Sequence, residues 1–213
     1  MALAPRYRKS NYVNANYDYL DIASGAGIIT FYGAIDQSGN GILTTNSNIA
    51  SDDIETRTVG GAGVRIDKDF DVTVNKPMTL RGIMYAHVPM KMGYVASTHN
   101  AYIIVKLRKW DGAAETEIAS GTSSTTQVAV ADGLPDHDPI KHVKITIPTT
   151  VFKQGETIRV TLHVYDDVGT EYVAVAFDPR NRVSAITKAG DPQYFTGSMN
   201  TQFICNIPIK IVL

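Results

Sequence analysis

The chain has 213 residues, of which 44% are hydrophobic and 19% are charged, and its formal net charge is −1 at pH 7. This length fits one large β domain, with or without an extended arm, and argues against two full domains. A charge near zero supplies no field of one sign to attract nucleic acid or an anionic membrane, so neither is expected as a partner.

The first 60 residues differ in composition from the rest of the chain. The opening "MALAPRYRKSNYVNANYDYLDI" lacks the apolar alternation that would bury it. It is crowded with tyrosine, which offers a large contact area and a hydroxyl for hydrogen bonding. We expect an extended N-terminal arm that binds a partner, and the alternative is a disordered tail. The candidate partner-binding residues are Arg6, Tyr7, Arg8, Tyr12, Tyr17 and Tyr19.

Two short segments, "GIITFYGAI" (27–35) and "GILTTN" (41–46), predict a hairpin-like pair at the end of this arm. The glycines of "VGGAGV" (59–64) then indicate a hinge. The sequence therefore predicts an arm with a short hairpin over residues 1–60 and a β-sandwich domain over residues 61–213.

Apolar and polar residues alternate from about Val64 onward, which is typical of strands with one buried face. In the first half of this region, strands are predicted near residues 64–74, 78–90, 101–110 and 116–124. Asp111 and Gly112 supply the turn between the last two, which makes them hairpin partners.

The alternation continues at residues 142–148, 158–165 and 171–179 and in a final strand that runs to Leu213. Pro208 within the final strand predicts a sheet edge or a bulge. Cys205 is in phase with Phe203 and Ile207 and is expected to be a buried structural thiol. About eight strands with uneven loops predict an all-β fold, an antiparallel β-sandwich of the jelly-roll type.

The histidine spacing argues against a jelly-roll metal enzyme, because none of the five histidines has a histidine or carboxylate two positions later. Asp67, Asp69 and Asp71 resemble the start of a calcium loop, but Val72 and Met78 stand where an EF-hand needs Gly and Glu. The three carboxylates are expected to share the solvent face of a strand. Neither a metal nor a cofactor is expected.

The sequence also lacks a motif for catalysis. No G-x-S-x-G, P-loop or dinucleotide fingerprint occurs. His137, between Asp136 and Asp138, is expected on a surface loop, and Asp178 in an Asx-type turn. We therefore expect a protein that is not an enzyme.

Three segments together carry a resemblance: "YDYLDIASGAGIITFYG" (17–33), "AFDPRNR" (176–182) and "IPIKIVL" (207–213). In this order they are similar to segments of an uncharacterised group of tailed-phage structural proteins. That group ends in Pro-Phe-Lys-Ile, from which Pro208-Ile209-Lys210-Ile211 departs. The resemblance implies a virion component, made in the host cytoplasm, and it attaches no catalytic residue to any of the three segments.

The favoured hypothesis is a capsid decoration or cement protein, a trimer that contacts the major capsid protein or other virion proteins and gains avidity by repetition. One alternative is a tail, neck or fibre-associated component. Another, from a different class, is a carbohydrate-binding module, for which Tyr102, Tyr165 and Tyr172 would form an aromatic platform.

Overall fold

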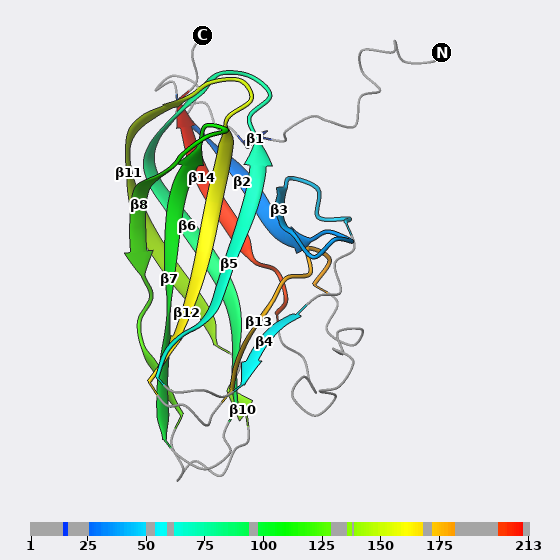
Figure 1. Ribbon diagram of the computed structural model, residues 1–213, viewed down its shortest axis with the longest axis vertical. Helices are drawn as coiled ribbons and strands as arrows, with labels where there is room; N and C mark the ends of the chain where they lie inside the picture. The colour runs from blue at the N-terminus through cyan, green and yellow to red at the C-terminus, as the bar shows by residue number, and fades with distance from the viewer. Residues whose placement is uncertain are drawn as a thin grey trace.

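The computed structural model describes residues 15–16, 26–49, 54–58, 62–93, 98–128, 136–137, 139–167, 172–181 and 200–210 (Figure 1). The first strands are β1 (Ala15–Asn16), β2 (Ala26–Ile35), β3 (Gly41–Thr44), β4 (Ile54–Thr58), β5 (Gly63–Thr73), β6 (Met78–Gly93) and β7 (His99–Trp110). The others are β8 (Glu115–Thr122), β9 (Thr126–Val128), β10 (Asp136–His137), β11 (Ile140–Phe152), β12 (Thr157–Asp166), β13 (Tyr172–Ala176) and β14 (Ile204–Lys210). The described residues contain no helix, so none of them forms a helix able to cross a membrane.

The strands join in one sheet in the order β4-β13-β6-β14-β2-β3-β5-β12-β7-β8, and β11 adds to β6. The neighbours run antiparallel except β3 and β5, which run parallel. The expected all-β fold is therefore confirmed, but the sheet is mixed rather than antiparallel throughout. From β5 to β14 the described residues form ten strands, where about eight were expected, because β9 and β10 are too short to show a period.

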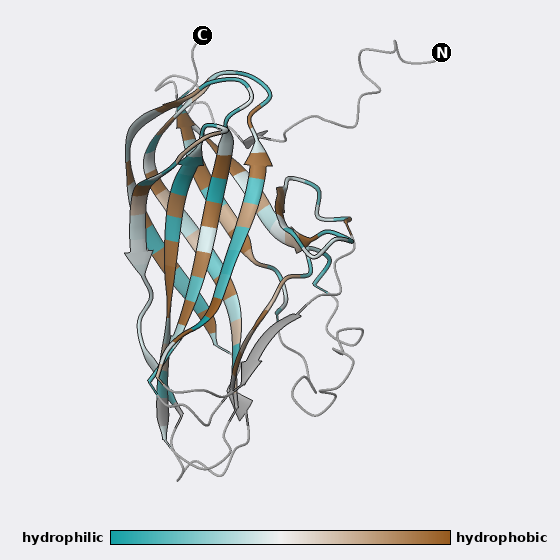
Figure 2. Cartoon of the chain, viewed as in Figure 1, coloured by the Kyte–Doolittle hydropathy of each residue, from teal (hydrophilic) through white to brown (hydrophobic). Residues whose placement is uncertain are grey.

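Figure 1 shows β5, β12, β7 and β8 in one layer, in front of β2, β14, β6 and β11. The two layers also touch without pairing, since β11 contacts β7 and β8. Hydropathy alternates along these strands (Figure 2), and their apolar positions meet between the layers. The rings of Phe177 and Phe203 pack edge-on against Phe70, with centroids 4.8 and 4.9 Å away.

The expected alternation is confirmed in most strands. Val143, Ile145 and Ile147 of β11 are buried while the residues between them are exposed. In β13, however, Ala174 and Ala176 are as buried as Val173 and Val175. That strand lies between β4 and β6, and small alanines allow other parts of the chain to cover its second face.

Pro208 lies in β14, between β2 and β6, so the expected sheet edge is wrong and the expected bulge is confirmed. The register of β14 against β6 shifts between Asn206 and Ile209. Because the regular backbone hydrogen bonds to β6 are already interrupted there, the missing N–H of Pro208 costs none of them. On the β6 side lies Gly82, with a φ of 127°, and a Cβ added there would stand 3.3 Å from the Cβ of Pro208. Glycine is needed at this position because an L side chain rarely adopts that φ.

The two segments expected to form a hairpin do pair antiparallel with each other, as β2 and β3, so that prediction is confirmed. Both strands also belong to the main sheet. β2 pairs with β14 and β3 pairs with β5, and Ile29, Phe31 and Ile35 lie in the core. The alternation in "GIITFYGAI" shows that this strand has a buried face. It does not show which strands pair with it, so its place within the main sheet could not be predicted. The division at residue 61 into an arm and a sandwich stays a prediction.

Candidate functional site

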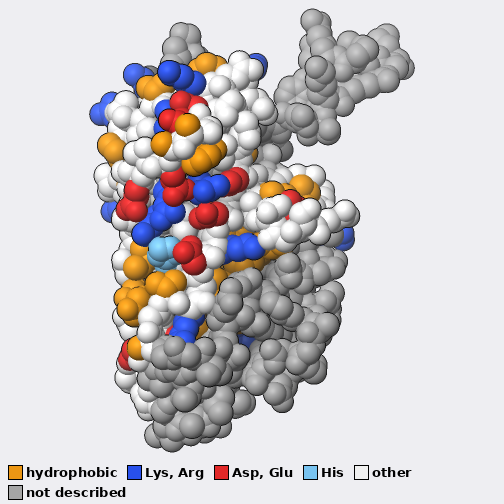
Figure 3. Space-filling view, viewed as in Figure 1, with side chains coloured by type: hydrophobic (Ala, Val, Ile, Leu, Met, Phe, Trp, Pro, Cys, Tyr) orange, Lys and Arg blue, Asp and Glu red, His pale blue; other side chains and the backbone are white. Residues whose placement is uncertain are grey.

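Among the described residues, a group of interacting charged side chains lies on the outer face of β5, β12, β7 and β8. Figure 3 shows acidic, basic and histidine side chains gathered across the middle of this face, which we call the charged face. The register pairs its residues in rows: Asp67 with His163, Asp69 with Thr161, and Asp71 with Arg159. Strand alternation brings these side chains to one side of the sheet while Phe70, Val160 and Leu162 point into the core.

Arg159 is the centre of the charged face. Its Nε and Nη2 donate to the two carboxylate oxygens of Asp71 at 2.8 and 2.7 Å, and its Nη1 donates to Glu115 at 3.0 Å. Its Nη1 also lies 3.4 Å from a carboxylate oxygen of Asp69. Hydrogen bonds with Asp71 are the main cause that raises the pKa of the Arg159 guanidinium above its ordinary value. Since protein carboxylates engage the guanidinium in this way, Arg159 joins β5, β12 and β8 rather than presenting a free anion site.

The other carboxylates of the "DKDFD" run are paired in the same manner. Thr161 donates its hydroxyl to Asp69 at 2.5 Å, and His163 Nε2 lies 3.2 Å from Asp67. The expectation that Asp67, Asp69 and Asp71 share a solvent-facing side is confirmed, and each has a partner directly across on β12. Among the described residues, no three histidine, cysteine or carboxylate side chains converge to hold a metal ion.

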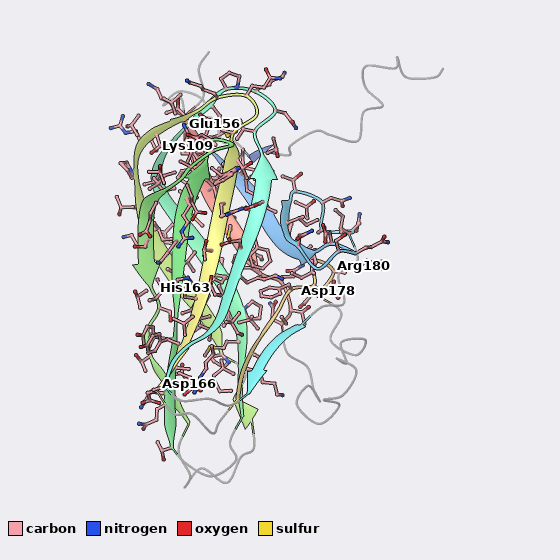
Figure 4. The ribbon with its side chains drawn as sticks, in the orientation of Figure 1. Lys109, Glu156, His163, Asp166, Asp178 and Arg180 are labelled. Carbon is pink, nitrogen blue, oxygen red and sulfur yellow. The ribbon has the colours of Figure 1, made fainter. Side chains whose placement is uncertain are left out.

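His163 and Asp67 form the acid–base pair of the charged face, and Figure 4 shows His163 midway along it. An imidazole beside a carboxylate has the geometry of a general acid–base pair. The neighbouring hydroxyl of Thr161 is donated to Asp69 rather than to His163. The pair can therefore move a proton, but Thr161 is not activated by it as a nucleophile.

Two tyrosines stack next to this pair. Tyr102 of β7 and Tyr165 of β12 are cross-strand neighbours, with ring centroids 5.0 Å apart and planes inclined by 15°. The third residue of the expected aromatic platform, Tyr172, lies on β13, which does not border this layer.

A second polar group lies at the end of the sheet where two turns meet. Asp111 accepts hydrogen bonds from the backbone N–H groups of Ala113 and Ala114, which confirms the expected turn after Trp110. Lys109 and Glu156 form an ion pair of 2.6 Å there (Figure 4), and a hydrogen bond from Lys109 lowers the pKa of Glu156. Between the turns is an open hollow lined by Asp111, Ala113, Lys153, Gln154, Gly155 and Glu156.

The loop after β13 has the expected Asx-type turn. Asp178 Oδ1 accepts the backbone N–H of Arg180 at 2.9 Å, and Asn181 follows with a φ of 56°. The side chain of Asn181 accepts the N–H of Thr201 at 2.8 Å, which fastens this loop to the segment before β14. Arg180 points away from Asp178 in Figure 4, and its Nε donates to the backbone carbonyl of Asn48.

The structure also brings together residues that sequence reasoning missed. His87 of β6 and His142 of β11 face each other with their Nδ1 atoms 2.6 Å apart. Burial is the main cause that lowers the pKa of His87, and the charge of His142 is the second. The His87 imidazole is therefore neutral at pH 7. The two histidines stand 55 positions apart in the sequence, and no sequence pattern indicates that they meet.

Lys141 is a second group that the sequence did not reveal. Its side chain is only 2% exposed and donates to the carbonyl of Ser124 at 2.7 Å and to the hydroxyl of Thr126. Burial lowers its pKa to about 8. The only hint in the sequence is its place directly before the alternating "HVKITIP" segment.

The remaining expectations have three outcomes. Cys205 is fully buried and burial raises its pKa, which confirms a structural thiol. The surface loop expected around His137 is a two-residue strand, β10, whose backbone pairs with Gly93 and Met92 of β6. Six candidate partner-binding residues lie outside the described residues: Arg6, Tyr7, Arg8, Tyr12, Tyr17 and Tyr19.

Comparison with known proteins gives no match to any family model and none to a curated protein. The resemblance to the tailed-phage group therefore stays a prediction, as do the capsid partners, the trimer and the virion location.

Solved structures do share the fold. A CocE/NonD family hydrolase from Staphylococcus aureus matches with a TM-score of 0.51 and 14% identity, over 86% of this chain and 37% of that one. An aminopeptidase from a marine sediment Thaumarchaeota archaeon matches with a TM-score of 0.52 and 10% identity, over 86% and 37%. An α-amino acid ester hydrolase matches with a TM-score of 0.50 and 10% identity, over 84% and 36%. This chain thus spans little more than a third of each of these proteins.

These matches contradict the expectation of a non-enzymatic phage capsid decoration protein, because the proteins that share the fold are hydrolases and an aminopeptidase. The same finding contradicts the alternatives of a tail, neck or fibre component and of a carbohydrate-binding module. The expectation failed because alternation reveals a fold, and one fold carries many unrelated functions.

Proposed function

We propose that this chain is the β-sandwich part of a hydrolase that acts on aminoacyl esters or amides. The observation that carries the proposal is the match of at least 84% of the chain to an α-amino acid ester hydrolase and to an aminopeptidase. An α-amino acid ester and a peptide with a free N-terminus both present an aminoacyl carbonyl to the attacking nucleophile, so one substrate class covers both.

We further infer that the two layers are a jelly-roll sandwich. Four long strands in each layer and a shared apolar core support this inference. Such a sandwich provides a rigid support on which other parts of a hydrolase can be held in place.

The described residues contribute the His163–Asp67 pair to this chemistry. In hydrolysis such a pair accepts a proton from the nucleophile and returns it to the leaving group. The nucleophile itself comes from outside this pair, because the Thr161 hydroxyl is donated to Asp69 and the Cys205 thiol is buried.

The test uses the full chain with an affinity tag, isolated from the organism whose genome encodes it. The preparation is assayed with the 4-nitrophenyl ester of an α-amino acid and with an aminoacyl 4-nitroanilide. We expect hydrolysis of at least one of them, and a His163→Gln variant distinguishes a role of the described pair from support alone. A matched preparation with Leu162→Asp, which places a carboxylate in the core, serves as the unfolded control.

Loss of turnover in His163→Gln, with the fold intact, would place this imidazole in the reaction. Full activity in that variant would restrict the chain to a supporting role within the hydrolase. If the folded chain and everything isolated with it hydrolyse neither substrate faster than the control, the proposed function is wrong.

A further inference from the structure

The outer face of the second layer carries two histidines whose ring nitrogens converge. His87 and His142 are directly opposite each other in the antiparallel register of β6 and β11. Their Nδ1 atoms are 2.6 Å apart, and the ring planes are inclined by 77° with centroids 4.8 Å apart. The two Nδ1 atoms therefore lie within hydrogen-bond distance of each other.

At this distance the two rings share one proton, with one Nδ1 donating and the other accepting it. The same two lone-pair directions suit a cation that replaces this proton, and imidazole nitrogen is a preferred ligand of zinc, copper and nickel. The two histidines thus form either a structural hydrogen bond or a two-ligand metal site, and a measurement of metal binding distinguishes the two.

The distance between the nitrogens indicates which ion fits. Two nitrogens that bind one ion at about 2.0–2.1 Å stand about 2.9 Å apart at a 90° angle and about 3.3 Å apart at a tetrahedral angle. The observed Nδ1–Nδ1 distance of 2.6 Å must widen less to reach the 90° geometry than to reach the tetrahedral one. Square-planar coordination of this kind is typical of Cu²⁺ and Ni²⁺.

The backbone holds the two ligands in place before any ion binds. On β11, buried Lys141 and Val143 flank His142, and on β6, buried Ala86 and Val88 flank His87. His142 itself is exposed, so solvent reaches the pair. No third histidine, cysteine or carboxylate of the described residues joins them, so these residues supply two ligands.

The geometry points to a site for a transition-metal ion at His87 and His142, with Cu²⁺ bound more tightly than Ni²⁺, and Ni²⁺ more tightly than Zn²⁺. This order follows the general affinity series for nitrogen ligands and is reinforced by the short distance between the nitrogens. The site lies on the opposite layer from the charged face and does not depend on the proposed hydrolase function.

The experiment titrates CuCl₂, NiCl₂ and ZnCl₂ separately into the full chain after treatment with a chelator, and calorimetry measures stoichiometry and affinity. We expect one Cu²⁺ per chain, and a loss of affinity of roughly 30-fold or more in His87→Gln and in His142→Gln, because a chelate loses its intramolecular second ligand. His163→Gln, which removes a histidine paired with Asp67 on the other layer, is the matched control and should bind Cu²⁺ as the wild type does.

Two further readouts keep the result independent of folding. The urea midpoint of each variant without metal shows whether the fold is intact, and exposed His142 is the variant to rely on if His87→Gln is destabilised. With Cu²⁺, the midpoint should rise in the wild type and in His163→Gln only. Equal Cu²⁺ affinity in the wild type and in folded His142→Gln would overturn the assignment, as would Zn²⁺ binding more tightly than Cu²⁺.

Discussion

Lys141 shows what a single residue contributes when its environment conflicts with its charge. The ammonium group is placed among Ser124, Thr126 and Ala101, whose oxygens accept its hydrogen bonds at one end of the core. Those bonds offset part of the cost of removing a cation from water, and the remaining cost lowers the pKa of Lys141 to about 8. Lys141 therefore couples the stability of the protein to pH.

We expect the wild type to gain stability relative to Lys141→Met as the pH rises from about 8 to about 10.5, the ordinary pKa of lysine. In that window the unfolded chain binds more protons than the folded chain, so the free energy of unfolding increases with pH. The gain is at most about 1.4 kcal/mol per pH unit. Urea unfolding of both proteins at pH 7.0, 8.5 and 10.0 measures it, and a difference that stays constant over this range would contradict a lowered pKa.

Among the strands, β3 is short and is held in place by the close contact of its Gly41 with the backbone of β5. It pairs antiparallel with β2 and parallel with β5, so it joins the two layers. Gly41 lies against β5, and a Cβ added to it would stand 2.0 Å from the backbone oxygen of Asp69. Because that oxygen belongs to a backbone within the sheet, it cannot move aside as a flexible side chain would.

We therefore expect Gly41→Ala to lower the free energy of unfolding by about 2–3 kcal/mol. The control is Gly39→Ala, where nothing lies within 4 Å and only the φ of 83° opposes a side chain. That control should cost about 1 kcal/mol. Urea denaturation of the two variants compares them, and equal losses would mean that β3 does not approach β5 as closely as the structure has it.

At the scale of the whole molecule, the last described strand lies in the interior of the sheet. β14 pairs with β2 on one side and β6 on the other, and it carries Cys205 and Ile207 into the core. Phe203, just before it, packs against Phe70 of β5. The end of the chain thus connects strands that are distant in sequence.

Deletion of residues 203–213 is expected to abolish cooperative unfolding, because β2 and β6 lose their common neighbour and the core loses Phe203. Deletion of residues 1–14, which removes no described residue, is expected to preserve the urea transition. Far-UV circular dichroism during urea titration distinguishes the two. A cooperative transition in the C-terminal deletion would show that β14 is dispensable for the fold.

Periodicity and turn residues were enough to locate most strands and their inward faces. A period of two needs only neighbouring residues, so Val143, Ile145, Val160 and Leu162 were assigned correctly to the core. Local turn chemistry was equally readable, since Asp111 and Asp178 cap backbone groups two or three residues away. The placement of Cys205 followed from the same period.

Which strands are neighbours could be read only from the folded chain. The charged face required the register of β5 with β12, and the His87–His142 pair required that of β6 with β11. The central positions of β2 and β14 likewise depend on pairing across more than 160 residues of chain, as the Thr30–Asn206 hydrogen bond does. Alternation fixes which side of a strand is apolar but carries no label for its partner, because any strand with a matching apolar face satisfies the same burial.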